Sequence, residues 1–130
     1  MNEDVVKKWI KKAESDLKIG LGEMESENPA TDAICFHMQQ CVEKYLKAFL
    51  IFKNQEIVKT HDIALLLKKC VELDEEFMIL FEKEIDILTD YAIEIRYPDD
   101  FYFPSIEETK KAIEKAKDVK NFVLSKLNWI

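Results

Sequence analysis

Four polar residues inside a hydrophobic helical stretch are the first candidates for chemistry in this chain. They stand among mostly apolar residues between positions 33 and 52, and they are His37, Gln40, Lys44 and Lys47. At 100° per residue, their side chains fall within an arc of about 80° on a helix. The rest of this helix is apolar in nearly every direction, which is typical of a helix at the centre of a bundle. Polar groups held there need partners. We call these four residues the polar seam.

The single arginine is the second candidate. The whole chain has eighteen lysines but a single arginine, Arg96. Arg96 comes just before Tyr97 and Pro98, where a predicted helix ends. Its guanidinium group is planar, permanently charged and suited to carboxylates and phosphates. If its helix packs beside the polar seam, these cations would converge on one place. The pattern then predicts a site for a nucleotide, for the phosphates of RNA, or for an acidic partner surface.

Plainer interpretations exist for both candidates. The polar seam is also explained as a solvated helix edge, on which Glu43 and Lys47 form an i,i+4 ion pair. Alternatively, carboxylates at Glu94, Asp99 or Asp100 neutralise the seam within the chain. Arg96 is also explained as a cation that the dipole of its own helix favours.

A third polar site opens a helix at Thr60-His61-Asp62. In the first turn of that helix, His61 is expected to help satisfy the unpaired N–H groups. His61 and Asp62 also count as secondary members of the binding site, together with Tyr97, Asp99 and Asp100.

The order and spacing of these pieces resemble the HEPN family of small helical domains. The resemblance rests on residues 36–50, on Thr60-His61-Asp62 and on Arg96-Tyr97-Pro98, and it extends from Trp9 to about Leu127. It implies a homodimer with a fold related to the C-terminal domain of aminoglycoside nucleotidyltransferases. It also implies a small nucleotidyltransferase as partner, in a two-component module of toxin and antitoxin character.

Many proteins of this family cleave RNA without a metal, using an arginine that a histidine follows four to six residues later. In this chain, positions 100 to 103 are Asp100, Phe101, Tyr102 and Phe103, so that histidine is missing. An aspartate there would repel the phosphate, and a tyrosine titrates too high to replace histidine. The leading hypothesis is therefore a binding or regulatory protein. The alternatives are a metal-independent ribonuclease that uses Arg96 with His37 or His61, and a purely structural dimeric bundle.

Length and composition narrow the class of protein. The 130 residues are expected to form one domain over residues 1–130, and the net charge of -7 argues against broad binding of nucleic acid backbones. Three cysteines without CxxC spacing, Cys35, Cys41 and Cys70, indicate packed, reduced thiols rather than disulfides. We expect a cytoplasmic protein with no metal, no cofactor and no membrane segment.

The 3.6-residue period of apolar residues predicts an all-α fold. The expected helices begin near Asn2, at Asn28-Pro29, at Thr60 or His61, near Asp74, and at a capping box that starts with Ser105. The second should end near Phe52 and the fourth at Tyr97. Together they predict an up-down bundle of four long helices plus one short helix.

The connection from Tyr97 to Pro104 holds four aromatic residues. So much apolar surface in a loop favours burial against the bundle or against another molecule. By the family resemblance this region lies near a twofold interface, which again predicts a homodimer.

Overall fold

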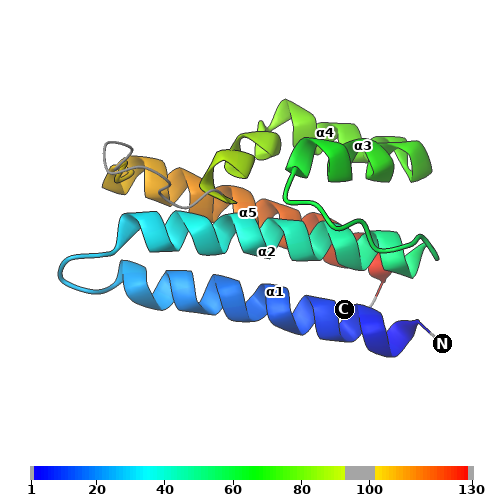
Figure 1. Cartoon of the computed structure of the whole chain (residues 1–130), viewed down its shortest axis with the longest axis horizontal. Helices are drawn as coiled ribbons and strands as arrows, with labels where there is room; N and C mark the ends of the chain where they lie inside the picture. The colour runs from blue at the N-terminus through cyan, green and yellow to red at the C-terminus, as the bar shows by residue number, and fades with distance from the viewer. Residues whose placement is uncertain (1, 93–101, 129–130) are drawn as a thin grey trace.

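Three helices of 22 residues form the body of the structure, a computed structural model that describes residues 2–92 and 102–128 (Figure 1). These are α1 (Glu3–Met24), α2 (Thr31–Phe52) and α5 (Ile106–Leu127). Four shorter helices complete it: α3 (Ile63–Leu73), the 3₁₀-helix η1 (Glu75–Phe77), α4 (Met78–Glu82) and the 3₁₀-helix η2 (Ile85–Ala92). Figure 1 shows α3 and α4 as a layer above α2 and α5, with α1 on the other side of α2. No strand occurs in the described residues, so the predicted all-α bundle is confirmed.

The second helix is the centre of the bundle, as its sequence predicts. α2 packs against α1, α3, η2 and α5. Tyr45, Leu46 and Phe49 on this helix are completely buried. A helix with neighbours on all sides must be apolar on nearly all sides, which explains the composition of residues 33–52.

The first two helices run side by side and are joined by a short turn that Glu23 stabilises. One carboxylate oxygen of Glu23 accepts hydrogen bonds from the backbone N–H of Ala30, at 3.0 Å, and from the hydroxyl of Ser26, at 3.1 Å. The predicted start of α2 at Asn28-Pro29 is therefore wrong by two residues. Because Glu23 holds Ala30 as part of the turn, the helix begins at Thr31.

The region predicted as one long helix from Asp74 is divided into η1, α4 and η2. Glu84 has a left-handed backbone conformation with φ of 58°, and it separates α4 from η2. Leu80 and Ile85, the buried residues on either side, are five positions apart, a spacing that one continuous α-helix would place on different faces. The break lets both residues face the core.

Side-chain caps fix the starts of α3 and α5. The Asp62 carboxylate accepts the N–H of Leu65 at 3.3 Å, so α3 begins at Ile63 rather than at Thr60 or His61. The Ser105 hydroxyl accepts the N–H of Glu108 at 3.0 Å, as the predicted capping box requires. Each cap satisfies one of the N–H groups that have no partner inside the helix.

Among the residues that the structure describes, none of the helices has the length and hydrophobicity needed to cross a bilayer.

Candidate functional site

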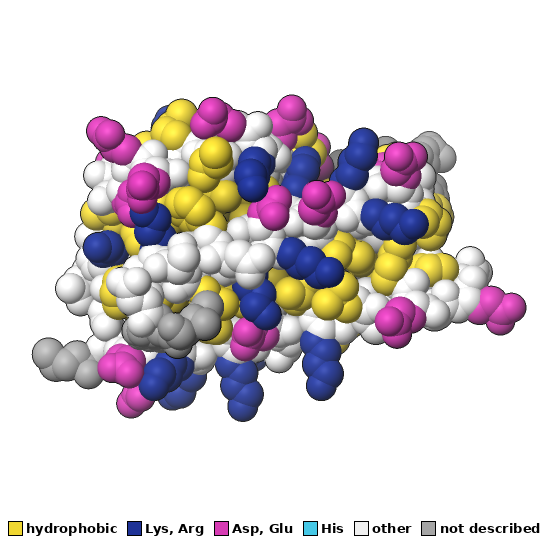
Figure 2. All heavy atoms as spheres, turned by 180° about the vertical axis from the view of Figure 1, so that it is seen from behind, with side chains coloured by type: hydrophobic (Ala, Val, Ile, Leu, Met, Phe, Trp, Pro, Cys, Tyr) yellow, Lys and Arg dark blue, Asp and Glu magenta, His cyan; other side chains and the backbone are white. Residues whose placement is uncertain are grey.

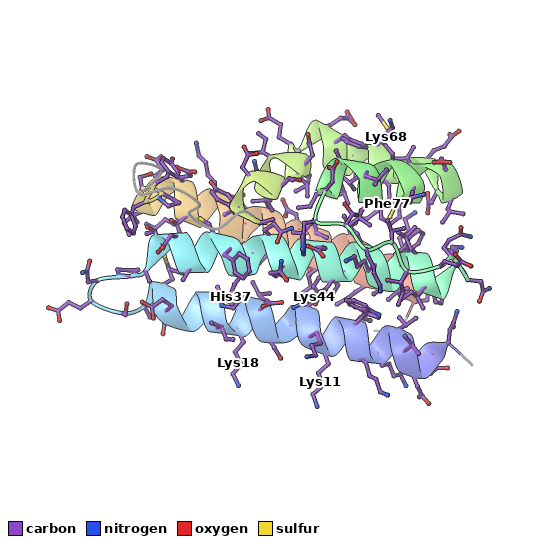
Figure 3. All side chains as sticks on the ribbon, viewed as in Figure 1. Lys11, Lys18, His37, Lys44, Lys68 and Phe77 are labelled. Atoms are coloured by element: carbon purple, nitrogen blue, oxygen red, sulfur yellow. The ribbon has the colours of Figure 1, made fainter. Side chains whose placement is uncertain are left out.

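A buried aspartate on α1 holds two members of the polar seam. Asp16 is 6% exposed, and its two carboxylate oxygens lie 2.8 Å from Nδ1 of His37 and 2.7 Å from Nζ of Lys44. Figure 3 labels His37 and Lys44 on α2, on the side where this helix adjoins α1. Both side chains remain partly exposed. We call these three residues the Asp16 cluster.

A second buried carboxylate, on α2 itself, gathers three more polar side chains. Glu43 is 4% exposed, and its Oε1 accepts a hydrogen bond from Nζ of Lys47 at 2.7 Å. Its Oε2 accepts from Nε2 of Gln39 at 2.9 Å and lies 3.0 Å from Nδ1 of His61. Gln39 and Lys47 are buried, whereas the side chain of His61 is 70% exposed. These four residues form the Glu43 cluster.

The hydrogen bonds of the Glu43 cluster keep its carboxylate ionised. Burial alone would raise the pKa of Glu43, but the hydrogen bonds from Lys47, His61 and Gln39 outweigh it and leave the pKa below its usual value. Since an ionised carboxylate can only accept hydrogen bonds, Nδ1 of His61 must carry the hydrogen.

This arrangement defines what His61 can do chemically. With Nδ1–H donated to Glu43, the other ring nitrogen of a neutral imidazole, Nε2, is free to accept a proton. The exposure of the ring makes it accessible from solvent. A buried carboxylate behind an accessible imidazole is the arrangement that orients histidine for general acid–base chemistry.

A third carboxylate, that of Glu108, binds one tyrosine on each side of residues 93–101. The phenol hydroxyls of Tyr91 and Tyr102 both donate hydrogen bonds to Glu108, in the first turn of α5. The pKa of Tyr91 is raised mainly by burial and next by its hydrogen bond to Glu108. The pKa of Tyr102 is raised mainly by its hydrogen bond to Glu108. Both phenols are therefore neutral donors at physiological pH.

The comparison with protein families identifies the fold. The sequence model of the HEPN domain family matches residues 6–127, nearly the whole chain. The chain belongs to the HEPN family. A search of curated proteins finds no match.

Two solved structures agree with this assignment. TT1696 from Thermus thermophilus is 26% identical, with a TM-score of 0.74 over 97% of this chain and 99% of that chain. ST0689, an archaeal HEPN homologue, is 25% identical, with a TM-score of 0.67 over 93% of this chain and 96% of that chain. The HEPN resemblance inferred from the sequence is thus confirmed.

Of the two carboxylates that pair with lysines of the polar seam, Glu43 is named by the sequence analysis and Asp16 is not. Lys44 pairs with Asp16, and Lys47 pairs with Glu43 as the i,i+4 spacing predicts. Gln40 donates a hydrogen bond to Oε1 of Gln39 at 2.7 Å. Glu94, Asp99 and Asp100, the carboxylates expected to neutralise the polar seam, lie outside the described residues. Arg96 and Tyr97 also lie outside them.

His61 is where the structure of this HEPN chain departs most clearly from the sequence-based expectation. Asp62 provides the side-chain cap of α3, while His61 lies before that helix and contacts Glu43. The residue patterns in the sequence did not point to Asp16. The feature that could have identified Asp16 is its position on the buried stripe of α1, between Ala13 and Gly20. A charged residue on a buried stripe must have a partner.

The cysteines are free and buried, as predicted. Burial raises the pKa of Cys41 to about 12, and it also raises the pKa of Cys35 and Cys70, so none of these thiols is activated. In the described part of the chain, no group of three or more histidine, cysteine or acidic side chains has the arrangement of a metal site.

Proposed function

We propose that this HEPN protein is a binding and regulatory protein that acts as the partner of a small nucleotidyltransferase, in a two-component module of toxin and antitoxin character. The observation that carries the proposal is the exposure of Tyr102 and Phe103, which are 61% and 64% exposed at the start of the last connection before α5. Aromatic side chains are enriched in the cores of protein interfaces. Two such neighbours on a surface favour contact with another protein.

The missing histidine supports binding rather than catalysis by the usual route of the family. None of the residues at positions 100 to 103 is a histidine. The two histidines of the chain, His37 and His61, are instead bonded to buried carboxylates on other parts of the fold.

We also propose a nucleotide or phosphate site around Arg96, to which His37, Gln40, Lys44 and Lys47 contribute. The pairing of Lys44 with Asp16 and of Lys47 with Glu43 lowers the positive charge available to a ligand. The main anion contact in this proposal is therefore Arg96, whose guanidinium can bind a phosphate through two parallel hydrogen bonds.

Two experiments test these proposals. Co-expression with a small nucleotidyltransferase from the same genome should yield a complex that copurifies, and its failure to form would contradict the partner role. For the phosphate site, titration with ATP and short RNAs at low salt should show binding that Arg96→Ala weakens by about tenfold or more. Equal binding by wild type and Arg96→Ala, or none by either, would remove the site.

The contact between Glu43 and His61 favours a second candidate function, metal-independent cleavage of RNA. His61 would remove the proton from a 2′-hydroxyl, whose oxygen attacks the adjacent phosphorus. The bond to the 5′-oxygen would break, a 2′,3′-cyclic phosphate would form, and the leaving 5′-oxygen would take up a proton. Arg96 would stabilise the charge on the phosphorane.

Lys18→Ala, at an exposed position of α1, supplies the control for this candidate, because Lys18 belongs neither to the Glu43 cluster nor to the polar seam. In the presence of EDTA, cleavage of a short RNA should be lost in His61→Ala and Arg96→Ala and retained in Lys18→Ala. If wild type does not cleave RNA, or if His61→Ala cleaves as fast as wild type, the ribonuclease candidate is excluded.

A further inference from the structure

An open groove of about 820 Å³ lies between α5 and the segment formed by η1 and α4. On one side it is lined by Glu75, Met78, Ile79 and Glu82, which follow a spacing of three, four and seven residues. The facing wall is provided by the side of α5 from Asp118 to Lys126. We call this the α4–α5 groove.

Contacts between its two walls hold the groove in shape. Phe77 and Phe122 pack edge to face with their ring centroids 4.8 Å apart. Lys83 pairs with Asp118 at 3.6 Å, and Lys126 pairs with Asp74 at 2.8 Å and also with Glu76. The walls are therefore joined through side chains contributed along the length of the groove.

Apolar and acidic side chains are exposed together along the wall formed by η1 and α4. Met78 is 47% exposed and Ile79 is 41% exposed. Glu75 and Glu82, at the two ends of this stripe, have no ion-pair partner among residues 2–92 and 102–128. Figure 2, which views the molecule from behind, shows hydrophobic side chains gathered between the upper layer and α5, with charged groups around them.

We propose that the α4–α5 groove binds a basic amphipathic helix of a protein partner. Side chains at i, i+3, i+4 and i+7 form ridges on a helix, and a groove between two such ridges suits the apolar stripe of a third helix. Lysine or arginine residues beside that stripe would pair with Glu75 and Glu82. This inference is independent of Arg96 and of the proposed nucleotidyltransferase partner.

The charge of the groove argues against a second copy of this chain as the occupant. In an isologous contact, Glu75 and Glu82 would face the same carboxylates of the other copy. Like charges placed across an interface cost binding energy, and the whole chain carries a net charge of -7. A basic partner relieves this repulsion instead.

The test uses a synthetic peptide of about four helical turns, with leucine at i, i+3, i+4 and i+7 and lysine at the flanking positions. Added to the ¹⁵N-labelled protein, it should shift the NMR signals of amides in residues 75–83 and 118–126 and bind less tightly as salt is raised. The same peptide with glutamate in place of lysine should not bind.

A matched pair of variants locates the site. Ile79→Ser combined with Glu82→Lys should weaken binding of the lysine peptide by about tenfold or more. Ile19→Ser combined with Glu27→Lys makes the same changes at exposed positions of α1 and of the turn after it, and should bind as wild type does. No binding of the lysine peptide at about 1 mM, NMR shifts outside the groove, or equal effects of the two variants would each overturn the proposal.

Discussion

Nδ1 of His61 lies 3.0 Å from Oε2 of Glu43, so that a largely exposed imidazole is bonded to a buried carboxylate of the central helix. This bond ties the chain before α3 to α2. The same carboxylate also binds Lys47 and Gln39, so one buried charge organises three other polar side chains. The Glu43 cluster therefore links the stability of the bundle to the orientation of His61.

Substitution of Glu43 should be strongly destabilising. Glu43→Gln leaves the buried ammonium group of Lys47 without a counter-charge, and we expect the free energy of unfolding to fall by about 3 kcal/mol. Urea unfolding measures this change. Glu56→Gln, at an exposed position, serves as the control and should change stability by no more than about 0.5 kcal/mol. Equal stability of the two variants would contradict the role of the Glu43 cluster.

Acid should remove the contribution of Glu43. Because the folded state lowers the pKa of Glu43, the unfolded chain takes up the proton more readily. The stabilisation is therefore present above the unfolded pKa of about 4.3 and is lost as the pH falls through the lower folded pKa. Urea unfolding of wild type and Glu43→Gln from pH 7 to pH 2 should show the difference between them narrowing at the acid end. A constant difference would show that the pKa of Glu43 is not lowered.

A charge in the centre of α2 should unfold the protein. Leu46 and Phe49 are completely buried, and the ring of Phe49 packs 4.4 Å from that of Phe77, centroid to centroid. Leu46→Asp or Phe49→Asp would each bury an unpaired charge, at a cost of several kcal/mol. Circular dichroism should show no cooperative melting for either variant, whereas Ile19→Asp, at an exposed position, should melt much as wild type does. Cooperative melting of Leu46→Asp would mean that α2 is not central.

The exposed aromatic pair should also support a homodimer. Tyr102 and Phe103 leave apolar surface uncovered in the described chain, and a twofold contact would bury the part of it that a nucleotidyltransferase partner does not cover. Light scattering at micromolar concentration should give the mass of a dimer for wild type and of a monomer for Tyr102→Ser combined with Phe103→Ser. A monomeric wild type would refute the dimer, and a dimeric double variant would place its interface elsewhere.

The sequence predicts a helix well where apolar residues recur at a regular helical spacing and where the residue that caps the helix is close to it in the sequence. The apolar composition of residues 33–52 identifies α2 as central, and Ser105 with Glu108 identifies the start of α5. The family resemblance, which rests on order and spacing, is confirmed over residues 6–127.

Long-range partners are harder to predict. Nothing near the polar seam in the sequence indicates that Asp16, on another helix, holds both His37 and Lys44. That pairing depends on how α1 and α2 are aligned along each other. The end of α4 was missed for a different reason: Glu84 adopts a left-handed conformation that is uncommon outside glycine, asparagine and aspartate.

We propose above that this HEPN protein acts by binding a small nucleotidyltransferase through its exposed aromatic surface, formed by Tyr102 and Phe103. Calorimetric titration of the purified protein with a purified small nucleotidyltransferase from the same genome tests this proposal most directly. We predict a saturable complex that Tyr102→Ser combined with Phe103→Ser weakens by about tenfold or more, and that Ile19→Ser leaves unchanged. Absence of a complex, or equal affinity of the double variant and wild type, would contradict the claim.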